Sequence, residues 1–249
     1  MLKYTINLLF VLCIGFGYSQ SESVDLQPKD TIVYKQKYGL RAGIDLSKLI
    51  ISNLNDDYTG LEIVGDYRLT QKLYLAVELG NEKRTKQEDL YNFTTSGSYI
   101  KLGVDYNTYE NWLNMDNSIY IGGRYAFSSF SQTLNNYQIY DTNRYWSPDD
   151  FTEGLTSDEE FSGLNASWLE FVLGIKAELF ANIYLGGSVR LAYLTSNNPS
   201  DKFPNLWIPG FNKVTDDSNF GIGYNYSITY SLPLYKKTKK KKVEVSVNQ

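Results

Sequence analysis

The sequence predicts an all-β protein, an eight-stranded antiparallel transmembrane up-and-down β-barrel with short periplasmic turns and long extracellular loops. Eight segments alternate apolar with small or polar residues, and a period of two indicates a β-strand. The connections between these segments alternate between short and long. The chain also opens with a segment typical of a secretory signal peptide, which directs the protein out of the cytoplasm.

The 249-residue chain divides into four predicted parts. Residues 1–19 combine Lys3, the apolar run 8–16 and small residues before Gln20, and this order predicts a signal peptide. Residues 20–36 are polar and predict a flexible periplasmic lead-in. Residues 37–235 form the barrel, and 236–249 form a lysine-rich periplasmic tail that is either solvated or in contact with an anionic surface such as lipid headgroups.

Each predicted strand places apolar residues at every second position. The first carries Leu40, Ala42 and Ile44 on one face, and the last carries apolar residues at every even position from Phe220 to Leu234. An even number of strands, each long enough to cross a tilted bilayer path, is typical of an outer-membrane barrel. The eight predicted strands span 38–46, 60–69, 73–80, 98–106, 118–128, 168–179, 183–193 and 218–235.

The polar face of these strands is unusual because glycine, alanine and serine dominate it and charged residues are distributed among them. In a soluble barrel this face would meet water and carry mostly Lys, Glu and Thr. Small residues instead fit a narrow lumen, where charges of both signs must pair because an isolated buried ion is costly. The predicted ion-pair network that plugs the lumen consists of Arg41, Asp45, Glu62, Asp66, Arg68, Glu78, Lys101, Asp105, Arg124, Glu170, Lys176, Glu178 and Arg190.

Aromatic residues of the apolar face lie near the strand ends. This position is typical of the girdles that membrane barrels present to the two interfaces. The predicted girdle residues are Tyr38, Tyr67, Tyr106, Tyr125, Phe127, Phe171, Tyr193 and Phe220.

Six segments carry a resemblance to a known family. They read EIVGDYRL (62–69), YLAVELGNE (74–82), GSYIKLGVDYN (97–107), YENWL (109–113), FSSFSQTLNNY (127–137) and GIKAELF (174–180). The chain resembles a family of Bacteroidota envelope proteins described as a domain of unknown function within the outer-membrane β-barrel group, over roughly residues 38–237. The resemblance implies fold and location, and it brings no activity or catalytic residues.

The composition argues against catalysis and against nucleic-acid binding. The sequence contains no histidine, which removes the usual base of nucleophilic triads and a common zinc ligand. Paired carboxylates such as Asp56-Asp57 and Asp149-Asp150 lie in predicted loops without the spacing of a calcium loop. A net charge of −4 does not suit phosphate neutralisation. We therefore expect no enzyme activity, no catalytic residue, no metal and no cofactor.

Two long loops carry the residues that we expect to bind a partner. Exposed aromatic side chains provide rigid contact area for glycans or proteins, although the same rings could instead pack together as an ordered cap. The candidates are Tyr137, Tyr140, Tyr145, Trp146 and Phe151 in the loop 129–165, and Trp207 in the loop 195–217, which we expect to fold against it.

The prediction for the whole chain is a small outer-membrane protein with a structural or adhesive role through its extracellular loops. Its expected partners are outer-membrane lipid, the barrel-assembly machinery and a glycan or protein ligand at the loops. The alternatives are a narrow passive channel for small solutes and a soluble periplasmic β-barrel carrier.

Overall fold

The computed structural model describes residues 31–109, 117–137, 155–180, 182–214 and 218–242. Residues 35–238 form one compact unit, and residues 1–34 with 239–249 form a second. The predicted signal peptide lies outside the described residues. The account below concerns the first unit.

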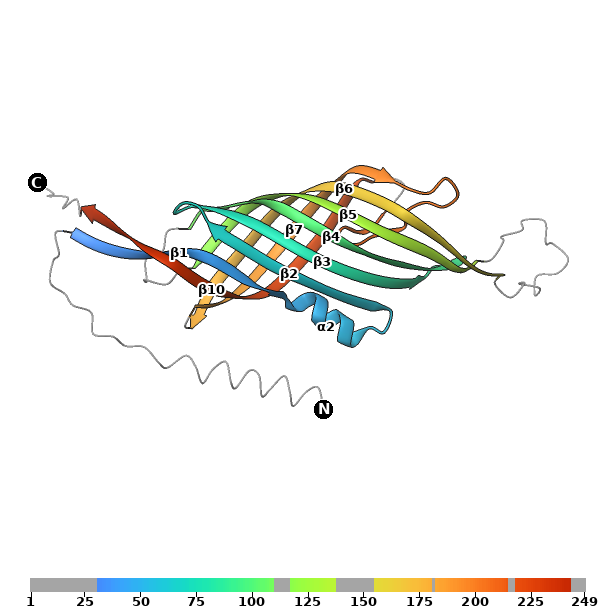
Figure 1. Ribbon diagram of the computed structural model, residues 1–249, viewed down its shortest axis with the longest axis horizontal. Helices are drawn as coiled ribbons and strands as arrows, with labels where there is room; N and C mark the ends of the chain where they lie inside the picture. Colours follow the sequence, from blue (N-terminus) through green and yellow to red (C-terminus); the bar gives the residue numbers. More distant parts are fainter. Residues whose placement is uncertain (1–30, 110–116, 138–154, 181, 215–217, 243–249) are drawn as a thin grey trace, which may run out of the picture. The chain divides into compact units, whose positions relative to one another are not determined.

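Eight long strands of the described chain close into a barrel (Figure 1). The order around the barrel is β1-β10-β7-β6-β5-β4-β3-β2, so strands that follow one another in the chain lie side by side. Neighbouring strands from β1 to β7 pair antiparallel, and so do β7 and β10. The strands are β1 (Thr31–Asp45), β2 (Tyr58–Arg68), β3 (Leu73–Gln87), β4 (Tyr91–Asn107), β5 (Ser118–Tyr137), β6 (Leu155–Phe180), β7 (Ile183–Asn198) and β10 (Phe220–Lys242).

The strands extend further than the alternation predicts. β1 begins at Thr31, within the segment expected to be an irregular lead-in, and β10 continues to Lys242, through the lysine run expected to be a tail. β5 continues to Tyr137 and β6 begins at Leu155, so both strands extend into the segment 129–165 that was expected to be a loop. The physical reason is that strand pairing is a property of the backbone, so it continues where side-chain alternation has ended.

Two elements of the first unit were not predicted. Helix α2 (Leu46–Leu54) follows β1 directly, so Leu46 begins a helix and does not end a strand. Its N-cap is Asp45, whose carboxylate accepts a hydrogen bond from the Ser47 amide at 2.8 Å. The second is a small hairpin of β8 (Trp207–Ile208) and β9 (Asn212–Lys213) between β7 and β10.

The two faces of the barrel wall reverse the arrangement of a soluble protein. Large apolar side chains on the outward rows are exposed, while the charged rows face inward and are buried. Of the predicted girdle residues, only Tyr38 departs from the outward row: it is buried, with the guanidinium of Arg68 5.0 Å from its ring centre and the Tyr235 ring stacked on it. The exposed outward residues include Leu61, Ile63, Leu75, Leu79, Leu102, Ile121, Tyr125, Leu169, Leu173, Ile175, Val189, Leu191, Ile222 and Leu234.

The apolar core of the barrel lies inside its long-loop end. Trp168, Phe130, Phe161 and Leu164 from β5 and β6 pack there with Ile208 and Phe211 of the hairpin. Among the described residues, no helix is long and apolar enough to cross a membrane.

Candidate functional site

The charged residues predicted for the lumen lie inside the barrel. Lys176 and Glu178, near the short-turn end, are partly exposed. The remaining eleven are buried: Arg41, Asp45, Glu62, Asp66, Arg68, Glu78, Lys101, Asp105, Arg124, Glu170 and Arg190.

Arg190 of β7 is the centre of a first charge cluster in the lumen. Its Nη1 lies 2.6 Å from Glu78 Oε2 and 3.7 Å from Glu170 Oε2, and its Nη2 lies 3.8 Å from Glu62 Oε1. Glu170 is also 2.8 Å from Lys101 Nζ. One guanidinium therefore links carboxylates from three strands across the lumen.

A second cluster of ion pairs lies nearer the short-turn end than the first. Asp105 contacts Arg124 at 2.7 Å and Lys176 at 3.8 Å, and Asp66 contacts Lys176 and Arg41, each at 2.7 Å. Arg124 also lies 3.5 Å from Glu78, and this contact joins the second cluster to the first. Buried ions shared in this way are held by more than one partner, which offsets part of their desolvation cost.

Three predicted members of the network have other roles. Asp45 forms no ion pair with a described cation, because its carboxylate caps α2 and accepts a hydrogen bond from the Tyr226 amide at 3.4 Å. Arg68 donates to the backbone carbonyls of Lys37, Thr70 and Gln71 at the short-turn end. Glu178 pairs with Lys37 at 3.1 Å, apart from the central clusters.

A third cluster, which the sequence analysis missed, lies at the long-loop end. Glu82 of β3 forms an ion pair with Lys48 of α2 and accepts a hydrogen bond from the Tyr58 hydroxyl at 2.9 Å. Tyr99 donates to Glu62 at 2.5 Å. A signal for Glu82 existed, because it continues the inward row of Glu78 past Gly80, where the predicted strand was ended too early.

The ion pair of Lys48 ties α2 to the barrel wall over the neutral pH range. Burial alone would lower the pKa of the Lys48 ammonium, but the carboxylates of Glu82 and Glu62 raise it above its ordinary value. A raised pKa in the folded state stabilises the fold fully below the ordinary lysine pKa of about 10.4. This stabilisation is lost only as the pH rises through the raised value.

The β8–β9 hairpin plugs the lumen from the long-loop end. Gly210, at its tip with φ 83°, donates its amide to Glu82 Oε2 at 3.0 Å and accepts from Lys101 Nζ at 3.1 Å. The Phe211 ring packs edge-on against Trp168 at 5.7 Å. The segment 195–217 contacts the segment 129–165 as expected, since the Phe203 ring stacks on that of Phe161 at 5.6 Å. Its hairpin also enters the barrel, where Glu82 and Lys101 of the wall hold it.

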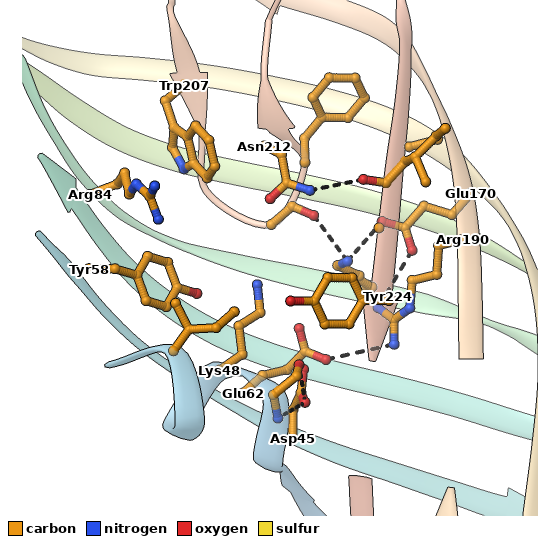
Figure 2. Close-up of a pocket in the computed structure, with 18 residues that line it drawn as sticks. Asp45, Lys48, Tyr58, Glu62, Arg84, Glu170, Arg190, Trp207, Asn212 and Tyr224 are labelled. Carbon is orange, nitrogen blue, oxygen red and sulfur yellow. Dashed lines mark hydrogen bonds and ion pairs between the residues drawn. The ribbon is translucent and has the colours of Figure 1, made fainter. Parts of the chain in front are cut away.

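Next to this plug is a cavity of about 260 Å³ (Figure 2). Its walls come from α2, the hairpin and seven strands, and Trp207, predicted as a surface-binding residue, lines it. Deeper in the lumen, between the two charge clusters, the second cavity measures only about 20 Å³. Figure 2 labels ten lining residues: Asp45, Lys48, Tyr58, Glu62, Arg84, Glu170, Arg190, Trp207, Asn212 and Tyr224.

The other predicted surface-binding residues are mostly outside the described chain. Tyr140, Tyr145, Trp146 and Phe151 all fall in 138–154. Tyr137 is the last residue of β5 and packs against the apolar core at the loop end.

Comparison with known proteins places the chain in a family without a known role. A family model described as a domain of unknown function (DUF6048) matches residues 1–237. The structure is similar to the crystal structure of Neisserial surface protein A (NspA), with a TM-score of 0.42 and 13% sequence identity over 82% of this chain and 100% of that chain. No curated protein matches the chain.

Proposed function

The chain belongs to the DUF6048 family, a domain of unknown function, and we propose that it is an outer-membrane β-barrel with a plugged lumen. Its role is structural or adhesive, and the surface at the long-loop end of the barrel makes the contacts. Outer-membrane lipid surrounds the wall, and the barrel-assembly machinery inserts it.

The single observation that carries this proposal is the reversed burial of the wall. Outward leucines, isoleucines and valines are about half exposed on neighbouring strands, as with Leu173 and Val189, while inward arginines and carboxylates are buried. Continuous apolar surface of this kind is rare on a protein in water and is typical of the lipid-facing band of a membrane barrel, which supports the proposal. Closure of the barrel also leaves no unpaired strand edge over most of the wall, as hydrocarbon requires.

The filled interior favours a closed barrel over a channel. The two charge clusters and the β8–β9 hairpin occupy the lumen, and the cavity between the clusters is about 20 Å³. A water needs about 10–15 Å³, so this space holds about one water molecule and no hydrated solute. Planar-bilayer recording tests the point: no steady current is expected, and a steady open-channel current would contradict a plugged lumen.

A heat-modifiability gel tests the membrane location. Folded membrane barrels resist unfolding in detergent until boiled, so outer-membrane fractions should show a band that shifts on boiling. Recovery of the protein in a detergent-free soluble fraction would instead support the periplasmic carrier.

The adhesive role has its own test at the loop between β5 and β6. We expect deletion of residues 138–154, which include Tyr140, Tyr145, Trp146 and Phe151, to abolish binding to neighbouring cells or glycans. A second variant replaces only these four aromatic residues with serine and keeps the length of the segment, and it should also lose binding. If both variants assemble and bind like the wild type, the loop is not the binding site.

A further inference from the structure

The barrel wall is interrupted at its long-loop end, between α2 and β10. β1 ends at Asp45, where α2 begins, whereas β10 extends further toward the long-loop end, to Phe220. Along its other edge, β10 pairs with β7 as far as Phe220. Opposite this level, α2 stands where a longer β1 would have run, as its place beside β2 in Figure 1 illustrates.

At this interruption, side chains form hydrogen bonds with backbone groups along the facing edges of β2 and β10. On β2, Ser52 of α2 accepts from the Gly60 amide at 2.8 Å and donates to the Gly60 carbonyl at 3.3 Å. On β10, Asp45 accepts from the Tyr226 amide, and Asn212 donates to the Ile222 carbonyl at 3.2 Å. Alternate residues of a strand direct their backbone groups to the same side, so this edge of β10 faces α2 without a strand beside it.

The 260 Å³ cavity reaches this interruption. Three consecutive residues of β10 line it, Ile222, Gly223 and Tyr224, although they alternate between the two faces of the wall. Ile222 and Tyr224 belong to the outward row, and their exposed fractions are 74% and 65%. The Ile222 carbonyl accepts a hydrogen bond from Asn212, which also lines the cavity, so the cavity reaches the edge of β10 that has no neighbouring strand.

The β3 side of the cavity holds a cation that pairs with no described carboxylate. Arg84 lies between two rings, with its guanidinium carbon 5.5 Å from the Tyr58 ring centre and 5.2 Å from that of Trp207. No described carboxylate lies within 4.0 Å of it, whereas the other lining cations, Lys48, Lys101 and Arg190, are all paired. The buried Nε of Arg84 and Nε1 of Trp207 are both donors without an acceptor among the described residues.

We propose that this cavity binds the anionic headgroup of a membrane amphiphile that enters sideways between α2 and β10. Arg84 and the Trp207 indole N–H bind the phosphate or carboxylate of the headgroup, and the acyl chain lies outside over Ile222 and Tyr224. α2 extends the apolar surface of this opening, since Ile50 and Leu54 are exposed on it. The apolar rim is the feature that selects an amphiphile over a free anion.

This inference rests on the proposed membrane location, and the experiment separates the two. The folded full-length protein in dodecyl maltoside micelles is titrated with phosphatidylglycerol, with phosphatidylcholine of the same acyl chains, and with inorganic phosphate. Native mass spectrometry counts the bound molecules. We expect one phosphatidylglycerol per protein, bound about tenfold more tightly than phosphatidylcholine, which corresponds to one charge-assisted hydrogen bond. Millimolar phosphate should not displace it.

Two variants of the cavity and one control test the site. Arg84→Gln should weaken phosphatidylglycerol binding about tenfold, to the level of phosphatidylcholine, and Arg84→Lys should retain part of the preference. Gly223→Leu keeps every charge but fills the cavity, because a β-carbon there meets only ordinary contacts at 3.8 and 4.0 Å, so it should weaken binding of both lipids. Lys83→Gln removes the adjacent, outward cation and should bind like the wild type.

Each outcome supports or overturns the inference. Unchanged phosphatidylglycerol binding by Arg84→Gln and Gly223→Leu, each shown to be folded by heat modifiability, would overturn it. Displacement of the lipid by millimolar phosphate would assign the site to free anions. A wild type that is heat-modifiable but binds no anionic lipid would refute the cavity alone, whereas a wild type soluble without detergent would refute the membrane location itself.

Discussion

At the scale of single residues, Arg190 is the most connected charge of the lumen. Replacing it with methionine keeps the volume but leaves Glu78, Glu62 and Glu170 with one fewer counter-ion inside the barrel. Breaking a buried ion pair from one side costs about 3–5 kcal/mol, so we expect Arg190→Met to lower the free energy of unfolding by that amount. Urea unfolding in lipid vesicles measures it.

The paired variant and a surface control complete this test. Arg190→Met with Glu78→Gln should cost less than the sum of the two single changes, by about 0.5–3 kcal/mol, because the second change removes a carboxylate that the first left unpaired. Lys202→Gln breaks an exposed pair with Glu159 and should stay within about 0.5 kcal/mol of the wild type. Strict additivity of the first pair would mean that the two residues do not interact.

At the scale of elements, the start of α2 depends on one side chain. Asp45→Ala removes the acceptor of the Ser47 amide, and the loss of an N-cap costs about 1 kcal/mol. Amide hydrogen exchange in the first turn of α2 should become about fivefold faster. Asp45→Asn is the matched control, because asparagine caps about as well as aspartate. Equal exchange in all three proteins would mean that the cap does not hold the helix.

The insertion of the β8–β9 hairpin into the lumen also depends on one residue, Gly210. Its φ of 83° is strained for other residues, and an added β-carbon would lie 2.6 Å from Tyr99 Cγ. Gly210→Ala should therefore destabilise the inserted hairpin by about 1–3 kcal/mol. Trypsin should then cut faster after Lys202 and Lys213, whereas Gly123→Ala, at an outward position with open space, should leave the cleavage rate unchanged.

At the scale of the whole molecule, the outward rows decide where the protein resides. Leu173→Arg places a charge in the apolar band, and such a change costs about 2–4 kcal/mol at the bilayer midplane. We expect its free energy of unfolding in lipid vesicles to fall by that amount. Leu90→Arg changes another exposed leucine, in the β3–β4 turn, and should fold like the wild type. Equal folding of both variants would exclude the membrane location of the wall.

Much of the barrel could be predicted because alternation is a local property of each strand. Leu40, Ala42 and Ile44 indicate their strand and face without knowledge of any partner. α2 also carried a local signal, since Asp45 is a good N-cap and Leu46, Leu49, Ile50 and Leu54 follow the helical period. That signal was outweighed by the alternation that runs into it from β1.

Sequence alone determined which residues face the lumen, because a period of two assigns every second side chain to one face. Tertiary structure alone decided which of them meet. Arg41 and Asp66 are opposite one another on adjacent strands, but Lys101 of β4 reaches Glu170 of β6 past the intervening strand β5, and Gly210 reaches Glu82 from 128 residues away. Such contacts depend on barrel closure and on the stagger between strands, which no single strand encodes. The interruption of the wall where α2 follows Asp45 is also a tertiary feature, because it exists only once β2, β1 and β10 lie side by side.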